Sequence, residues 1–281
     1  MSTPSFLEDH ISQIPALQLL MKMGYTYLTP EEALQLRGER QSTVLLEPVL
    51  RDQLKKINSI EYKEKSFEFS DSNIVLAITE LRDLPVQDGY ISANEAFYDL
   101  ITLGKSLEQT VLGDKKSFSF KYIDWKNPLN NCFHFTEEYA VARTDRNDTY
   151  RPDIVIFING IPMIVIECKT NVIKNPLEEA VSQHMRNQQE DGIRGLYLYS
   201  NILLSLAVNE ASYATTATSK KFWSVWKEVF RTKEEGQHYA DTLKMLKNNP
   251  LPDNERSQIF RQRYYSVLQH FNELEKEEIL V

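Results

Sequence analysis

The stretch that most constrains the fold is RPDIVIFINGIPMIVIECKT, residues 151–170. Two apolar runs flank an Asn-Gly pair at 159–160, and Asn-Gly between such runs is the strongest short-range signal for a β-hairpin. Both faces of each predicted strand are apolar, so both faces of the sheet are expected to be covered. The hairpin is nevertheless bounded by charge: Asp153 precedes the first strand, and Glu167 and Lys169 end the second. Carboxylates at the ends of buried strands are costly unless they are paired.

The side chains of Glu167 and Lys169 project from one face of the sheet, because the two residues are two positions apart on a strand. Asp153 shares that face only if the hairpin register has matching parity. A two-residue loop pairs position 153 with position 166 and places Asp153 on the opposite face. A three-residue loop with Gly160 in the left-handed conformation, or a β-bulge, restores parity. The sequence leaves these registers open.

An aspartate, a glutamate and a lysine on one face would suit metal-dependent cleavage of a phosphodiester bond. Mg²⁺ prefers hard oxygen ligands and keeps several waters, so two carboxylates and a backbone carbonyl can hold it. The ion polarises the phosphate and lowers the pKa of a bound water. A lysine can orient that water or offset the charge that develops on the phosphate. The alternative interpretation is a structural ion pair made by Lys169, and the residues alone leave both interpretations open.

Other candidate motifs are weaker. Gly-Lys-Ser at 104–106 matches the end of a phosphate-binding loop, but that motif requires a glycine where Asp99 stands and a strand before the loop. The pattern here is helical, so no nucleotide-binding site is predicted. Two cysteines and five histidines show no paired spacing for zinc. Nothing marks Cys132 and Cys168 as a disulfide, which indicates a reducing compartment.

Periodicity predicts further helices and strands along the chain. The predicted helices are 5–24, 48–57, 92–104 with a capping box from Ser92 to Glu95, one that starts with Asn175-Pro176, and helical material from about 219. The predicted strands outside the hairpin are 116–123, 139–142, 195–200 and 202–208. The last 45 residues are polar, charged and helix-prone, which is typical of a connector.

The net charge of −8 argues against avid DNA binding by this chain alone, because phosphate neutralisation supplies most of the affinity of nucleic-acid binders. A local basic groove is still compatible with that charge. The N-terminus has no basic region followed by an apolar run, so no secretory signal is predicted. The most apolar segment, 151–170, is interrupted well short of a membrane span. We therefore expect a soluble cytoplasmic protein without membrane association.

Most of the chain, from Glu8 to about Lys227, resembles the N-terminal nuclease domain of the restriction (R) subunit of type I restriction-modification enzymes, in the PD-(D/E)xK superfamily. Five segments carry the resemblance in order: LEDHISQIPALQLLMKMGYTYL, YIDWKNPLNNCFHFTEEYAV, RPDIVIFINGIPMIVIECKT, EEAVSQHMRNQ and FWSVWKE. The resemblance implies an α/β fold with a mixed β-sheet flanked by helices. It implies an endonuclease domain over 1–235 and a helical connector over 236–281.

The resemblance also implies an activity, that of a type I site-specific deoxyribonuclease that depends on Mg²⁺, with Mn²⁺ as a substitute. The implied catalytic residues are Asp153, Glu167 and Lys169. The implied metal ligands are Asp153, Glu167 and the backbone carbonyl of Cys168.

Two auxiliary positions follow from the same resemblance. Glu8 is the candidate for a glutamate that such domains often carry on the first helix. Gln183 matches a glutamine on the helix after the hairpin. Many relatives place a tyrosine four residues after that glutamine, and this chain has Asn187 there.

Type I restriction subunits continue into an ATP-driven translocase motor, and none of its phosphate-binding motifs occurs in this sequence. The chain is therefore expected to be the front piece of a larger subunit, with ATP bound only by the motor domain. The implied partners are double-stranded DNA and the methyltransferase (M) and specificity (S) subunits. Two alternatives stay open: a stand-alone nuclease of the same fold, resolvase-like or for repair, and a non-catalytic docking module.

Overall fold

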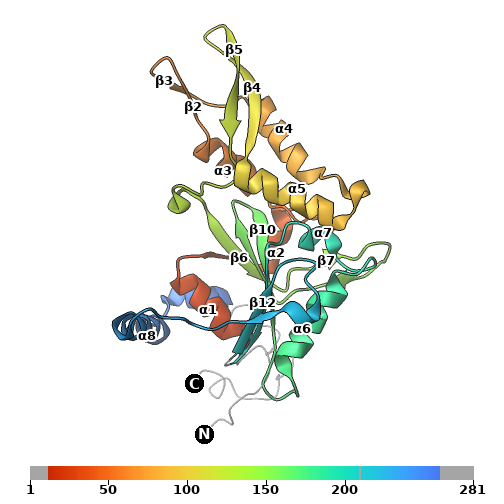
Figure 1. The fold of residues 1–281 in the computed structure, drawn as a ribbon, viewed down its shortest axis with the longest axis vertical. Helices are drawn as coiled ribbons and strands as arrows, with labels where there is room; N and C mark the ends of the chain where they lie inside the picture. Colours follow the sequence, from red (N-terminus) through yellow and green to blue (C-terminus); the bar gives the residue numbers. More distant parts are fainter. Residues whose placement is uncertain (1–11, 209, 260–281) are drawn as a thin grey trace.

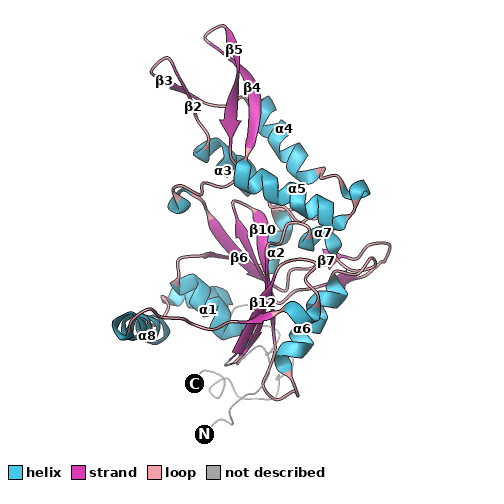
Figure 2. Ribbon diagram, viewed as in Figure 1, coloured by secondary structure: helices cyan, strands magenta, loops and turns pink. Residues whose placement is uncertain are grey.

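A seven-stranded mixed β-sheet forms the centre of the protein (Figures 1 and 2). The computed structural model describes residues 12–208 and 210–259. β1 pairs with β6 and β10 pairs with β11 in parallel, and the other neighbours in the sheet are antiparallel. In sheet order the strands are β1 (Thr26–Leu28), β6 (Phe133–Glu137), β9 (Ile154–Ile158), β10 (Ile161–Cys168), β11 (Ile202–Ala207), β12 (Glu210–Ala214) and β13 (Ser224–Val225).

Helices flank the sheet, with α1 on one side and α6 on the other (Figure 1). The helices of this part of the chain are α1 (Ile14–Lys22), α2 (Pro30–Gln35), α6 (Pro176–Asn187), α7 (Arg194–Tyr197), the short 3₁₀-helix η4 (Lys220–Phe222) and α8 (Lys233–Asn248). β7 (Val141–Ala142) and β8 (Thr149–Tyr150) form a separate two-stranded ribbon. The predicted fold class, a mixed sheet flanked by helices with helical structure near the C-terminus, is confirmed.

The two sheet faces bury separate apolar clusters. Ile154 and Ile166 pack with Leu17 of α1. Val155 and Val165, one position along each strand, belong to a larger cluster on the other face. Side chains alternate between faces along a strand, so this division of neighbours shows that both faces of the central hairpin are covered, as the apolar pattern predicts.

A lobe formed by residues 47–120 lies at the turn end of the hairpin (Figure 1, top). Its elements are α3 (Glu47–Ile57), β2 (Ile60–Tyr62), β3 (Lys65–Phe67), α4 (Asp71–Arg82), η2 (Val86–Asp88), α5 (Tyr90–Leu103), β4 (Lys105–Val111) and β5 (Asp114–Phe120). The backbone N–H of Leu46 donates to the carbonyl of Gly160 at 2.9 Å. Leu46 directly precedes α3, so the lobe adjoins the hairpin turn, at the end of β9 and β10 that is farther from Asp153 and Glu167.

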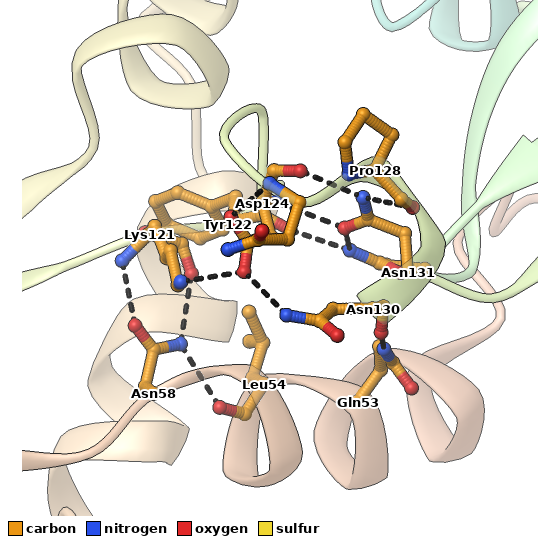
Figure 3. Close-up of polar contacts among 11 residues, drawn as sticks. Gln53, Leu54, Asn58, Lys121, Tyr122, Asp124, Pro128, Asn130 and Asn131 are labelled. Atoms are coloured by element: carbon orange, nitrogen blue, oxygen red, sulfur yellow. Dashed lines mark hydrogen bonds and ion pairs between the residues drawn. The ribbon is translucent and has the colours of Figure 1, made fainter.

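The chain returns from the lobe to the sheet through a loop held by polar contacts (Figure 3). The Asp124 carboxylate accepts hydrogen bonds from Lys121 Nζ (2.8 Å) and Asn130 Nδ2 (3.0 Å). The hydrogen bond from Lys121 is the main cause that holds the pKa of Asp124 well below its ordinary value. The Asn131 side chain bonds both the backbone N–H and the carbonyl of Asp124. These contacts fix the loop that contains η3 (Pro128–Asn130).

Three local predictions are wrong. The segment 195–200 is not a strand but the end of α7 and a buried turn. Its side chains are buried all round, and a short apolar run of this kind does not distinguish strand from helix. Helix α5 begins at Tyr90 after Gly89, so Ser92 lies inside the helix and caps nothing. The segment after 219 contains η4 and β13 before α8 begins at Lys233.

The proposed boundary between residues 235 and 236 stays a prediction, and α8 runs across it. Ile259, downstream of α8, is buried in the cluster that contains Leu17 of α1. Within residues 12–208 and 210–259, no helix is long and apolar enough to cross a membrane.

Candidate active site

The register of the β9–β10 hairpin decides whether Asp153 and Glu167 share a face. The turn has two residues, Asn159 and Gly160, and Ile158 pairs with Ile161 across it. A bulge between positions 162 and 164 then shifts the register, so that position 154 pairs with 166. Position 153 therefore lies opposite 167. Asp153, Glu167 and Lys169 lie on one face, at the end of the hairpin away from the turn.

The side chain of Asp153 binds the backbone of β10. Its Oδ2 atom accepts a hydrogen bond from the backbone N–H of Cys168 at 2.6 Å. Lys169 Nζ lies 4.0 Å from the same oxygen and donates to the carbonyl of Cys168 at 2.9 Å. Both side chains are nearly buried. These contacts bring the predicted carboxylate, lysine and backbone carbonyl together in one small region.

Glu167 is fully buried beside Asp153. Burial raises the pKa of Glu167 well above 4.5, the negative charge of Asp153 raises it further, and the positive charge of Lys169 opposes both effects. Glu167 Oε1 accepts a hydrogen bond from Asn187 Nδ2 at 3.1 Å. Oε2 is also buried and has no hydrogen-bond partner in the part of the chain that the structure describes. Such an unsatisfied buried acceptor is uncommon in a native structure and needs an explanation.

Of the two auxiliary candidates, the structure describes only Gln183. Glu8 lies outside the described residues. Gln183 is half-buried on α6, and within the described chain it makes no hydrogen bond to the three residues at the hairpin end. Asn187, one turn further on, contacts Glu167 directly. Sequence reasoning noted Asn187 only as a departure from the family pattern and missed this contact. Its spacing of four residues from Gln183 was the available signal.

A further buried carboxylate, Glu137, ends β6 next to the site. Tyr27 donates to its Oε1 at 2.6 Å, and Gln13 Nε2 donates to its Oε2 at 3.2 Å. The same Gln13 nitrogen donates to the backbone carbonyl of Asp153 at 3.2 Å. These contacts tie the backbone at Asp153 to the segment that leads into α1. Both residues lie within segments that carry the family resemblance, but nothing in the sequence was a reason to assign them a role, because their contacts depend on the tertiary fold.

The donor set at the hairpin end suits a hard cation. Asp153, Glu167 and the carbonyl of Cys168 offer oxygen atoms, which are the ligands that Mg²⁺ prefers. The unpartnered Oε2 of Glu167 is an acceptor that a cation could satisfy. Within the described residues, no group of three or more His, Cys, Asp or Glu side chains is arranged to hold a metal ion. An ion here would therefore use two side chains, a carbonyl and water, which is usual for Mg²⁺.

Comparison with known proteins gives a consistent assignment. Residues 5–222 match the family described as "Type I restriction enzyme R protein N terminus". The chain is similar to the MjaIXP and MjaVIIIP endonuclease subunits of Methanocaldococcus jannaschii, with 26% identity over 248 residues and 31% identity over 244 residues. It is also 26% identical over 253 residues to the type I restriction enzyme HindI endonuclease subunit of Haemophilus influenzae. Each match covers 86% of this chain but only 22–23% of the relative.

Proposed function

The chain belongs to the family of type I restriction enzyme R protein N termini, and on that premise we propose that it cleaves phosphodiester bonds of double-stranded DNA. The observation that carries the proposal is the bulge in β10, which brings Asp153 and Glu167 to one face beside Lys169. Without that bulge, the two carboxylates would project from opposite faces.

In this proposal Asp153, Glu167 and the carbonyl of Cys168 hold Mg²⁺, or Mn²⁺ as a substitute. The bound ion would polarise the phosphate and lower the pKa of a water. Lys169 would offset the negative charge that develops on the attacked phosphate. Its Nζ atom donates to the carbonyl of Cys168 and lies 4.0 Å from Asp153 Oδ2, a position that supports this role.

The remainder of the proposed function concerns the full-length subunit, of which this chain spans less than a quarter in its relatives. We propose that a motor region outside this chain binds ATP and translocates DNA. The assembled enzyme would also contain methyltransferase and specificity subunits. Cleavage and translocation would then belong to different domains.

Three substitutions in the assembled enzyme test this division: Asp153→Ala, Glu167→Ala and Lys169→Ala. Each should reduce DNA cleavage by on the order of 10²-fold or more while ATP-driven translocation continues. Removing a carboxylate deletes a metal ligand, whereas removing the lysine removes positive charge at the phosphate. Cleavage at the parental rate in all three variants, or loss of translocation as well, would show that the assigned roles are wrong.

The alternative of a non-catalytic docking module has one observation in its favour, because Lys169 contacts Asp153 Oδ2 as a structural ion pair would. Metal titration of the chain separates the two functions. The nuclease proposal requires Mn²⁺ binding that Asp153→Ala abolishes and Lys169→Ala retains. A structural ion pair has no need of a metal ion.

A further inference from the structure

Asn187 links Glu167 to a second layer of buried polar groups. Its Nδ2 atom donates to Glu167 Oε1 at 3.1 Å and to the hydroxyl oxygen of Tyr197 at 3.3 Å. A side-chain amide nitrogen carries two hydrogens, so one nitrogen can serve both acceptors. Asn187 and Tyr197 are at most 1% exposed. The contact to Glu167 is therefore made in a region where few alternative partners exist.

His184 sets the direction of these hydrogen bonds. Its Nε2 atom lies 3.2 Å from the carbonyl oxygen of Leu204, and its Nδ1 atom lies 3.0 Å from the Tyr197 hydroxyl. A carbonyl only accepts, so Nε2 must carry the hydrogen. Burial lowers the pKa of His184 to about 3, so the ring is neutral and Nδ1 is an acceptor. The Tyr197 hydroxyl consequently donates to His184.

This direction determines how the amide of Asn187 is turned. Because Tyr197 uses its hydrogen on His184, its oxygen can only accept from Asn187. A flipped amide would place Asn187 Oδ1 against the oxygens of both Tyr197 and Glu167. The observed orientation avoids that, even though it leaves Oδ1 buried without a partner in the described part of the chain. The nitrogen is therefore held toward Glu167.

We propose that Asn187 is a positioning residue that fixes the Glu167 carboxylate for the metal ion, and that Tyr197 and His184 fix Asn187 in turn. Asn187 holds Oε1, which leaves Oε2 as the Glu167 oxygen that is free to bind a cation. The inference rests on the proposed function, since it assigns Glu167 as a metal ligand. Groups that orient metal ligands in this way typically contribute about 10- to 100-fold to metal affinity.

The test is Mn²⁺ titration of the 281-residue chain by calorimetry, with thermal unfolding of each variant measured in parallel. Asn187→Leu keeps the size of the side chain and removes the N–H groups. It should weaken Mn²⁺ binding by roughly 10- to 100-fold. Tyr197→Phe leaves Asn187 in place but frees its amide to turn. It should weaken binding by a smaller factor and supplies a second variant if Asn187→Leu folds poorly.

The matched control is Gln188→Leu. Gln188 is the next residue on the chain, is also buried, and bonds the carbonyl of His184 and the N–H of Ala217. It makes no contact with Glu167. If Asn187 were only structural, Asn187→Leu and Gln188→Leu would both lower the melting temperature and leave Mn²⁺ affinity unchanged. Of these two variants, the inference requires that Asn187→Leu weakens Mn²⁺ binding and that Gln188→Leu does not.

The outcomes are distinguishable. If the parental chain binds Mn²⁺, Asp153→Ala abolishes this binding and Asn187→Leu weakens it, both the proposed function and the inference are supported. If Asp153→Ala abolishes Mn²⁺ binding but Asn187→Leu and Tyr197→Phe both keep the parental affinity, only the inference is overturned. A parental chain that binds no Mn²⁺ overturns the proposed function and the inference together.

Discussion

At the scale of single residues, Glu167 is a costly group for the fold to bury. It is fully buried, lies beside Asp153, and has one oxygen without a partner in the described chain. Its protonated form is favoured in the folded state, because burial and the charge of Asp153 raise its pKa well above 4.5. Active sites commonly keep such unfavourable groups because function requires them.

This raised pKa makes stability depend on pH. Between about pH 4.5 and the folded pKa, the folded state binds more protons at Glu167 than the unfolded state does. The stability contributed by this group is therefore fully present below 4.5 and is lost as pH rises. Glutamine cannot ionise, so the Glu167→Gln variant does not lose this stability as pH rises. In EDTA at pH 7 the variant should be more stable by about 0.5–2 kcal/mol, and the gain should shrink as pH falls toward 4.5.

Urea unfolding of both proteins at several pH values checks this expectation. Glu179→Gln is the control. It makes the same chemical change at an exposed glutamate, in the first turn of α6. Its effect should be within a few tenths of a kcal/mol and should not follow the same pH dependence. A Glu167→Gln variant whose stability advantage is equal at all pH values would contradict the interpretation.

The sequence predicted the residues of the candidate site better than their contacts. Asp153, Glu167 and Lys169 were identifiable because each stands at the end of an apolar strand. Whether they meet depended on the bulge between 162 and 164, and the sequence left that register open. Asn187 could not be found by charge or periodicity. Its contact depends on how α6 packs on β10, which is a tertiary property.

At the scale of elements, the turn of the hairpin packs closely against the backbone of residues 46–50. Gly160 has φ +81°, and a Cβ atom at this position would lie 2.7 Å from the carbonyl oxygen of Leu46 and 3.0 Å from the backbone nitrogen of Leu50. Both are backbone atoms that cannot rotate away. Gly160→Ala should therefore lose about 1–3 kcal/mol through φ strain alone, and more through the contact with Leu46.

Chemical denaturation of Gly160→Ala and Gly113→Ala separates these two causes. Gly113 also has a positive φ, +85°, but no atom lies within 4 Å of a Cβ built there. It should show only the strain from φ. Equal losses in the two variants would mean that the close approach of the lobe to the hairpin turn contributes nothing.

Elements with strong local signals were predicted, and those that depend on tertiary contacts were not. Helix α3 and the central hairpin have clear periodicity or turn residues, and both are present. The segment 195–200 has alternating apolar residues, yet it forms α7 and a turn. There the hydroxyl groups of Tyr197 and Tyr199 reach His184 and the carbonyl of Leu81. Buried tyrosines need such partners, and the sequence does not show where those partners lie.

At the scale of the whole molecule, the negative charge is unevenly distributed. Residues 71–103, which contain α4 and α5, have six acidic residues and one arginine, a net charge of −5 out of the −8 of the chain. The acidic residues are Asp71, Glu80, Asp83, Asp88, Glu95 and Asp99. This stretch belongs to the lobe at the turn end of the hairpin (Figure 1). Its excess of negative charge makes it an unfavourable surface for DNA.

Because the net charge of the chain is −8, the isolated chain should bind duplex DNA weakly, with a dissociation constant no tighter than about 10⁻⁵ M in about 0.15 M salt, within the range of non-specific binding. Fluorescence anisotropy with a labelled duplex measures this affinity.

Neutralising four acidic residues of the stretch 71–103, by Asp83→Asn, Asp88→Asn, Glu95→Gln and Asp99→Asn, should change the affinity for DNA little. Exposed charges separated by more than about 8 Å are largely screened at this ionic strength, so the negative charge of the lobe should have little effect on DNA bound at the hairpin end. Tight binding with a steep dependence on salt concentration would instead reveal a basic groove at the site. A large gain in affinity from the four substitutions would show that these acidic residues limit DNA binding.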